Sequence, residues 1–243
     1  MRKNILITGA AKRIGATCAR LLHEQGCNIL LHFNASRVEA ESLCAELNQK
    51  RLDSAALFQC DLLNMQALET LAETAAEHWS GVDALINNAS TFYPTPFADV
   101  TEQHWENLLG SNLKAPFFLS KALADKLKLR QGCIINIVDI HAERGLPGHS
   151  VYSIAKAGLV AMTKILAKEL GPEIRVNAVA PGAMLWPEKG LSDHEKTEIL
   201  QRVPLGRCGS PEDIAKAVLY LIKDADYVTG QVITIDGGRT LFY

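Results

Sequence analysis

Two residues that could transfer protons, Tyr152 and Lys156, lie four positions apart in a segment with helical periodicity. Residues at this spacing project from the same face of a helix. A phenol with its ordinary pKa of about 10 exchanges protons poorly at neutral pH, and a nearby ammonium lowers that pKa by stabilising the phenolate. The pair therefore predicts general acid–base chemistry by Tyr152. The same spacing is also common between solvated neighbours on a helix, so the surroundings must support this interpretation.

A second candidate site is the turn that follows the first apolar run of the chain. It reads Thr8-Gly9-Ala10-Ala11-Lys12-Arg13-Ile14-Gly15. Glycine lets the backbone turn tightly and approach a pyrophosphate, whose charge then lies at the N-terminus of the following helix. Only two of the three usual glycines are present, and such a turn can also be purely structural. Its place directly after the first strand of an alternating series favours a dinucleotide site.

The end of the second apolar run indicates which dinucleotide is bound. An NAD site needs an acidic residue about twenty positions after the glycine turn, where it binds the ribose hydroxyls. No acidic residue lies between Glu24 and Glu39. We expect NADP instead, with donors to a 2′-phosphate among His32, Asn34, Ser36 and Arg37. Arg13 adds a cation beside the phosphates, and Ser36 is also a candidate cap of the next helix.

These residues must be positioned by alternating strands and helices. Nearly continuous apolar runs predict parallel strands covered on both faces, at residues 4–8, 28–33, 55–60, 84–87, 133–138, 175–180 and 231–235. Helical periodicity predicts helices at residues 13–24, 37–50, 65–79, 102–126, 152–170 and 212–222. The alternation predicts one α/β domain over residues 1–243, with right-handed crossovers and a doubly wound parallel sheet.

Residues 182–209 do not fit this alternation. The segment contains two prolines and one short polar helix candidate around residues 193–202. An irregular stretch of this length inside a compact domain is usually a lid or a binding loop. We expect a substrate lid, with a solvated surface excursion as the alternative.

Composition argues against several classes of partner. The 243 residues include 25 basic and 27 acidic side chains without a long basic tract, so nucleic acid is not expected. The six cysteines lack zinc-type spacing and the seven histidines form no HxxxH or HExxH pattern, so no metal is expected. The N-terminal apolar run ends at Thr8-Gly9, which is too short for a signal sequence or a membrane span. We expect a cytoplasmic protein.

Motifs along the whole chain resemble the short-chain dehydrogenases/reductases. The matching residues are Thr8-Gly9 with Gly15, Asp61-Leu62, Asn87-Asn88-Ala89, Asn112, Tyr152-Ser153-Ile154-Ala155-Lys156, Asn177, Pro181-Gly182 and Asp236-Gly237-Gly238. The resemblance implies a Rossmann fold with seven parallel strands in the order 3-2-1-4-5-6-7 and a nicotinamide cofactor across their carboxyl ends. It also implies that Lys156 holds the nicotinamide ribose and that Asn112 anchors a water in a proton relay.

Three stretches of the sequence resemble particular families within this superfamily. Residues 8–15, residues 88–96 and Val138-Asp139 look like the corresponding parts of the pteridine reductases. Most short-chain reductases carry a serine about thirteen residues before the tyrosine, where this chain has Asp139. Residues 139–145 are also similar to bacterial dihydromonapterin reductases.

The resemblance implies NADPH-dependent reduction of 7,8-dihydropterins such as dihydrobiopterin or dihydromonapterin, with dihydrofolate as a further candidate. Reduction of a C=N bond needs a proton on nitrogen, which Asp139 could shuttle beside Tyr152, while Phe92 could stack on the flat ring. One alternative is a carbonyl reductase for a 3-oxoacyl thioester or a sugar-derived ketone, and another is an NADP-binding protein without activity. Asp139 could also form an ion pair with Arg13 or Arg144, and Phe92 could be an oligomer contact.

Three groups of residues make up the expected site. We expect proton transfer by Asp139, Tyr152, Lys156 and Asn112. We expect the cofactor to be bound by Gly9, Arg13, Ile14, His32, Asn34, Ser36, Arg37, Asp61, Leu62, Asn88, Ala89, Ser90, Tyr152, Lys156, Pro181 and Gly182. We expect the substrate to contact Arg13, Ser90, Phe92, Asp139, Tyr152, Leu185 and Trp186.

Assembly is also expected from the resemblance, because members of the superfamily are commonly tetramers built through two long helices. Here these are the predicted helices at 102–126 and 152–170. The second helix carries Ala155, Ala157, Gly158 and Ala161, small residues that permit close helix approach. We therefore expect a homotetramer.

Overall fold

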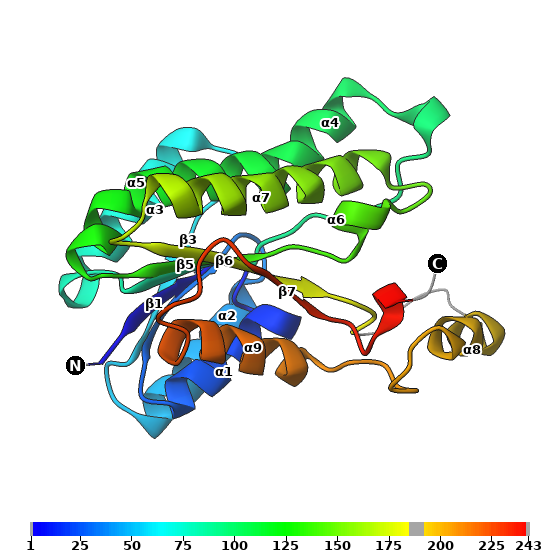
Figure 1. Cartoon of the computed structure of the whole chain (residues 1–243). Helices are drawn as coiled ribbons and strands as arrows, with labels where there is room; N and C mark the ends of the chain where they lie inside the picture. Colours follow the sequence, from blue (N-terminus) through cyan, green and yellow to red (C-terminus); the bar gives the residue numbers. More distant parts are fainter. Residues whose placement is uncertain (1, 185–191, 242–243) are drawn as a thin grey trace.

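The described part of the chain contains seven strands that form one sheet at the centre of the molecule (Figure 1). The computed structural model describes residues 2–184 and 192–241. The strands are β1 (Asn4–Ile7), β2 (Asn28–Phe33), β3 (Ala55–Gln59), β4 (Ala84–Asn87), β5 (Cys133–Ile137), β6 (Arg175–Pro181) and β7 (Val232–Ile235). All neighbouring pairs are parallel, in the order β3-β2-β1-β4-β5-β6-β7. The predicted doubly wound α/β fold and its strand order are confirmed.

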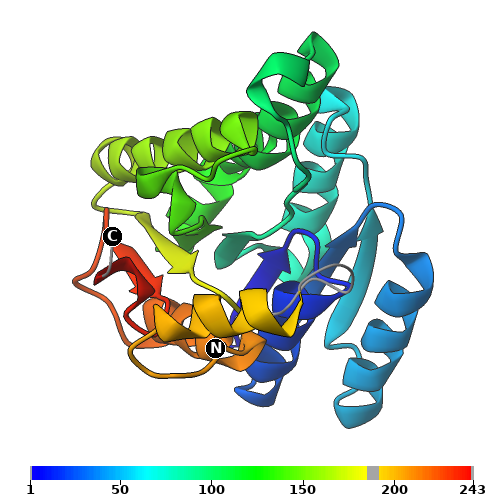
Figure 2. The ribbon, with the colours of Figure 1, turned by 90° about the vertical axis from the view of Figure 1, so that its right-hand side faces the viewer.

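Helices cover both faces of the sheet, as Figures 1 and 2 show. One layer consists of α1 (Arg13–Glu24), α2 (Arg37–Lys50) and α9 (Pro211–Lys223). The other layer contains α3 (Met65–Glu77), α5 (Ala115–Leu129) and α7 (Ser150–Glu169), and α4 (Glu102–Leu109) packs against α7. The short helices α6 (His141–Arg144) and α8 (Asp193–Gln201) lie at the end to which the strands point.

The core lies on both sides of the sheet, which explains the apolar runs in the sequence. β1, β4 and β5 are buried along their whole length. One described helix, α7, has the length and composition of a membrane-spanning segment. Most of this helix is buried against the rest of the molecule, as is usual for a core helix of an α/β domain. The six cysteines are free thiols, four of them buried.

The predicted continuous helix at 102–126 is wrong, because the chain forms α4, a π-helical turn at Gly110–Lys114 and then α5. Asn112 explains part of the interruption, since its side-chain amide donates to the Leu108 carbonyl at 3.0 Å and competes with the helical backbone. Pro116 explains the rest, because it has no N–H to donate to the carbonyl four residues earlier. Single π-helical turns inside helices occur frequently at functional sites.

The described parts of the segment 182–209 are residues 182–184 and 192–209, and they include α8 as the predicted short helix. The segment is anchored at both ends. Gly182 N–H donates to the Ile235 carbonyl at 2.9 Å, and a Cβ on Gly182 would lie only 2.6 Å from the Cβ of Asp236. Leu205 N–H donates to the Gly237 carbonyl at 3.1 Å. The expected substrate contacts Leu185 and Trp186 fall within residues 185–191, outside the described residues.

Candidate active site

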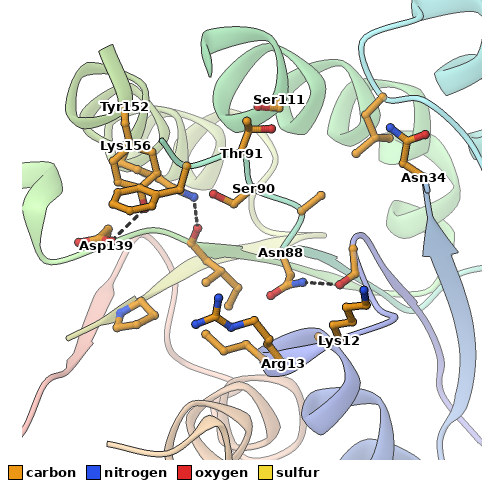
Figure 3. Close-up of a pocket in the computed structure, with 18 of the residues that line it drawn as sticks. Lys12, Arg13, Asn34, Asn88, Ser90, Thr91, Ser111, Asp139, Tyr152 and Lys156 are labelled. Carbon is orange, nitrogen blue, oxygen red and sulfur yellow. Dashed lines mark hydrogen bonds between the residues drawn. The ribbon is translucent and has the colours of Figure 1, made fainter. Parts of the chain in front are cut away.

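The carboxyl ends of the strands border a cavity of about 910 Å³. Sheets of this type bind ligands where the strand order reverses, here between β1 and β4. Figure 3 shows Asn34 on one side of this cavity and Tyr152, Lys156 and Asp139 on the other. The structure brings together most of the expected site in the cavity wall: Gly9, Arg13, Ile14, His32, Asn34, Ser36, Asp61, Leu62, Asn88, Ala89, Ser90, Phe92, Asp139, Tyr152, Lys156, Pro181 and Gly182.

The glycine turn is shaped by contacts that exclude larger residues. Gly9 has a φ of +61°, which favours glycine, and a Cβ there would lie 2.9 Å from the Cα of Ala89. A Cβ on Gly15 would lie 2.7 Å from Nδ2 of Asn88. This same Nδ2 donates to the carbonyls of Thr8 and Gly9, at 2.9 and 3.0 Å. The loop after β4 therefore holds the turn after β1 in a fixed position.

The start of α1 fits a bound pyrophosphate. Lys12 is the N-cap of α1, no side chain caps the helix there, and its first turn carries no acidic residue. The backbone N–H groups and the positive end of the helix dipole are therefore available to an anion. Ile14 and Gly15 at this helix start line the cavity. These features fit a dinucleotide phosphate group at this position.

His32 has a different role from the one predicted. Its Nδ1 accepts the Gly9 N–H at 3.2 Å, and its Nε2 lies 3.0 Å from the Cys60 carbonyl. Because Nδ1 is an acceptor, the hydrogen must be on Nε2 and the ring is neutral. Burial also lowers the pKa of His32. His32 thus supports the glycine turn, and with both ring nitrogens bonded to protein it has no free donor for a 2′-phosphate.

The cavity wall contains Asn34 and Ser36, but Arg37 does not line the cavity. The Arg37 guanidinium donates to Gln59 and forms an ion pair with Glu41 at 3.3 Å. It thus lies toward β3, a placement that periodicity alone does not reveal. These partners explain why the structure does not bring Arg37 into the site.

Lys12 is a cavity residue that the sequence reasoning missed. Its Nζ forms an ion pair with Glu39 Oε1 at 2.6 Å, and this bond lowers the pKa of Glu39. The available signal was its position inside the glycine turn, next to Arg13. A lysine here places a movable cation within the site, close to the segment that replaces the acidic residue of NAD sites.

Three of the four residues expected to transfer protons, Asp139, Tyr152 and Lys156, cluster between β5 and α7. Tyr152 Oη donates to Asp139 Oδ2 at 2.9 Å, and the His141 N–H donates to Asp139 Oδ1 at 2.8 Å. Lys156 Nζ donates to the Ile137 carbonyl at 2.9 Å and lies 5.7 Å from the centroid of the Tyr152 ring. Tyr152 and Lys156 share one face of α7, as their spacing predicts, and Asp139 follows the end of β5.

The electrostatics differ from the expectation that an ammonium lowers the pKa of Tyr152. Burial raises the pKa of Tyr152, and the negative charge of Asp139 raises it further. Burial also lowers the pKa of Lys156 to about 8, a change that the charge of Asp139 partly opposes. Tyr152 is therefore held in its protonated form, as a proton donor requires.

Asn112 lies behind the cavity wall and is fully buried. Its Oδ1 accepts the Ser90 hydroxyl at 2.7 Å, and its Nδ2 donates to the Thr91 carbonyl at 2.9 Å. It does not line the cavity, unlike Ser90 and Thr91. These bonds hold the loop after β4, and the structure does not bring Asn112 into contact with Tyr152 or Lys156.

Phe92 forms part of the cavity wall beside Tyr152. The two rings meet edge to face with centroids 4.8 Å apart, and the other neighbour of Phe92 is His149, stacked at 4.6 Å. Phe92 is 56 % exposed, so a ligand in the cavity can reach it. Sequence reasoning did not include His149, nor the wall residues Thr91, Asn107, Ser111, His141, Leu146 and Met184.

Fold and site together define a nicotinamide-dependent oxidoreductase of the Rossmann type. Residues 9–240 match a family model described as enoyl-(acyl carrier protein) reductase. The chain belongs to this family, within the short-chain dehydrogenases/reductases. The predicted superfamily is thereby confirmed, and NADP(H) is the cofactor, as expected.

The chain is similar to known proteins over almost its whole length. A 3-oxoacyl-acyl-carrier-protein reductase FabG of Staphylococcus aureus (strain Mu50) is 35 % identical over 242 residues, covering 98 % of each chain. The enzyme of the same name from Chlamydia trachomatis serovar D is 36 % identical over 248 positions, covering 98 % of this chain and 97 % of its own. These relatives overturn the predicted pteridine reductase assignment, so dihydropterin or folate reduction is not the activity we assign.

Proposed function

We propose that this protein reduces the ketone of a 3-oxoacyl thioester to a 3-hydroxyacyl thioester with NADPH. The observation that carries the proposal is the end-to-end similarity to reductases named for this substrate, at 98 % coverage of both chains. The buried, protonated tyrosine at one end of the cavity suits the same reaction. Ketone reduction requires hydride at carbon and a proton at oxygen.

The chain supplies the proton and the binding groups for this reaction. Bound NADPH supplies the hydride. Tyr152 donates its proton to the carbonyl oxygen of the substrate, exchanging its bond to Asp139 for one to the substrate. Lys156 holds the nicotinamide ribose and, once charged, stabilises the phenolate that Tyr152 becomes. The helix N-terminus at Lys12 holds the pyrophosphate, and Gly9 and Gly15 let the turn pack closely against the loop after β4.

Asp139 has to act differently from the serine that stands at its position in most of the superfamily. A serine can donate a hydrogen bond to a substrate carbonyl, whereas an ionised carboxylate only accepts. In the structure Asp139 accepts from Tyr152 and from the His141 N–H. Its role in the proposed reaction is to keep the proton on Tyr152 until a carbonyl oxygen replaces the carboxylate. This role favours reduction over oxidation at neutral pH.

The remaining parts of the proposal concern the lid, assembly and location. Residues 182–209 form the substrate lid of a single domain, and Gly182 at the start of this segment lines the cavity. A homotetramer built through α5 and α7 would cover exposed apolar side chains of these helices, among them Phe117, Phe118, Ile154 and Ile165. A cytoplasmic location agrees with six free thiols.

The proposal is tested by following NADPH oxidation with acetoacetyl-coenzyme A, acetoacetyl-acyl-carrier-protein, a sugar-derived ketone and 7,8-dihydrobiopterin. We expect turnover with the two thioesters and none with the other two. Tyr152→Phe should abolish the thioester activity while still binding NADPH. Turnover confined to the other compounds would refute the substrate assignment, and NADPH binding without any turnover would refute the enzyme activity.

A further inference from the structure

Four buried polar side chains join the central strands to the helices on one face of the sheet. Asn87 on β4 and Asn136 on β5 are neighbours in the sheet, and Asn87 Nδ2 donates to Asn136 Oδ1 at 2.9 Å. Asn136 Nδ2 donates to Thr163 Oγ1 on α7 at 2.9 Å. Asn87 Nδ2 also donates to Ser120 Oγ on α5 at 3.4 Å. Each of the four side chains is at most 3 % exposed.

The two hydroxyl groups stand at the ends of this series of hydrogen bonds, and their donor and acceptor roles are fixed. Thr163 Oγ1 donates to the Leu159 carbonyl at 2.8 Å, and Ser120 Oγ donates to the Pro116 carbonyl at 2.7 Å. Each hydroxyl therefore donates its hydrogen to a carbonyl of its own helix and accepts a hydrogen bond from an asparagine amide. Around the network lies an otherwise apolar layer. Burying polar groups there is costly unless they are bonded, so this arrangement specifies how α7 seats on β5.

The Asn136–Thr163 bond lies next to the proton-transfer residues. Ile137 follows Asn136 on β5, and its carbonyl accepts the bond from Lys156 Nζ at 2.9 Å. Lys156 and Thr163 are seven residues apart, which is close to two turns of helix and places them on one face of α7. β5 and α7 are thus joined at two points along the same face, and one of these points is the lysine.

We propose that Asn136 and Thr163 are positioning residues that hold α7 against β5 so that Lys156 reaches both Tyr152 and the nicotinamide ribose. The proposal rests on the role given to Lys156 above. A lysine side chain has four rotatable bonds, so its buried Nζ is placed by the seating of its helix as well as by its own bond to Ile137. Sliding of α7 on β5 would move Tyr152 and Lys156 together, away from the cofactor held by the loops after β1 and β4.

Three variants separate this role from general support of the fold. Thr163→Val keeps the shape of the side chain and removes the hydroxyl, whereas Thr163→Ser keeps the hydroxyl. Ser120→Ala is the matched control, because it removes the corresponding hydroxyl at the other end of the network, on a helix without proton-transfer residues. For each variant we would measure Tm, kcat and KM with acetoacetyl-coenzyme A, the pH profile of kcat, and the Kd of NADPH from cofactor fluorescence.

We expect Thr163→Val to lower kcat about tenfold, as misplacement of a catalytic group does, and to shift the pH profile. The Kd of NADPH should rise in Thr163→Val. The kcat, pH profile and NADPH Kd of Thr163→Ser should stay close to those of the original protein. Ser120→Ala should lower Tm without changing kcat or Kd. Equal losses of kcat in Thr163→Val and Ser120→Ala, or an unchanged kcat and Kd in Thr163→Val, would overturn the proposal. If the original protein does not turn over the thioester, the proposed function fails, and the NADPH Kd values still decide this inference.

Discussion

The hydroxyl of Tyr152 donates a 2.9 Å hydrogen bond to Oδ2 of Asp139, within a pocket that buries most of the tyrosine. A carboxylate at this distance opposes ionisation of the phenol, because a second negative charge would form beside the first. Burial acts in the same direction and raises the pKa of Tyr152. Asp139 therefore keeps on Tyr152 the proton that reduction of the substrate consumes.

The first prediction concerns Asp139→Asn, which keeps the shape of the side chain and removes its charge. Oxidation of a 3-hydroxyacyl thioester with NADP needs Tyr152 as the phenolate, so its rate rises with pH as the phenol ionises. Without the neighbouring charge, the pKa of Tyr152 falls, and the rising limb should move to lower pH by about one unit. The measurement is the pH profile of kcat in the oxidation direction.

The control for this prediction is Asp53→Asn, a charge change at a residue that does not line the cavity. It should leave the profile in place. An Asp139→Asn profile that coincides with that of the original protein would show that the carboxylate does not set the ionisation of Tyr152.

The second prediction concerns Tyr152→Phe, which removes the proton donor and keeps the ring against Phe92. Loss of a positioned general acid typically costs about 10²–10⁴-fold in rate. We expect kcat to fall by that amount with little change in the Kd of NADPH. Tyr220→Phe is a suitable control, because Tyr220 is exposed on α9 and does not line the cavity. A Tyr152→Phe enzyme with more than a tenth of the original kcat would exclude Tyr152 as the acid.

The fold could be predicted from the sequence because the central strands β1, β4 and β5 are short apolar runs buried on both faces. The runs 28–33 and 84–87 match β2 and β4 without change. The break between α4 and α5 could not be predicted from periodicity, since apolar spacing continues through Asn112. It depends on one side chain that competes for a backbone carbonyl and on Pro116, which lacks a donor.

The placement of the candidate site was predictable where residue type decides it: the glycine turn and the Tyr152–Lys156 pair both line the cavity. It was not predictable where the role depends on which partner a side chain finds. His32 binds the Gly9 N–H, and Arg37 bonds Glu41 and Gln59. The substrate was predicted wrongly because a carboxylate and an aromatic ring suit many ligands. Asp139 and Phe92 form only part of the cavity wall that a substrate contacts.

The third prediction concerns pH and stability, through Lys156. Burial lowers the pKa of Lys156 in the folded protein from 10.5 to about 8. Between these values the unfolded chain binds more protons than the folded one, so this lysine makes the free energy of unfolding increase as pH rises. Lys156→Met removes that dependence and also the cost of a buried charge below pH 8. We expect the variant to gain stability relative to the original protein at pH 7 and to lose that advantage towards pH 10.

Urea unfolding of both cofactor-free proteins at intervals from pH 7 to pH 10 measures this difference. Taking the difference between two proteins cancels the titration of all unchanged groups. Equal slopes of unfolding free energy against pH would mean that Lys156 has the same pKa in both states. The range stops at pH 10 because tyrosines of the unfolded chain begin to ionise there.

The fourth prediction concerns the choice between NADPH and NADH at Lys12. Its Nζ is bonded to Glu39 at 2.6 Å, and both side chains are about half exposed, so solvent screens the pair and the lysine can exchange partners. We expect Lys12 to leave Glu39 for the 2′-phosphate of NADPH. Lys12→Ala should then raise the KM for NADPH about tenfold, the effect of losing one charge-assisted hydrogen bond, and leave the KM for NADH unchanged.

Glu39→Gln provides the opposing change, because it releases Lys12 without altering the backbone of α2. It should lower the KM for NADPH and leave kcat with saturating cofactor as it was. Arg20→Ala is the matched control, since Arg20 is also paired with a glutamate of α2, Glu46, but lies outside the cavity wall. If Lys12→Ala raised the KM for both cofactors alike, Lys12 would act on the shared pyrophosphate, and the preference for NADPH would have to come from Asn34 and Ser36.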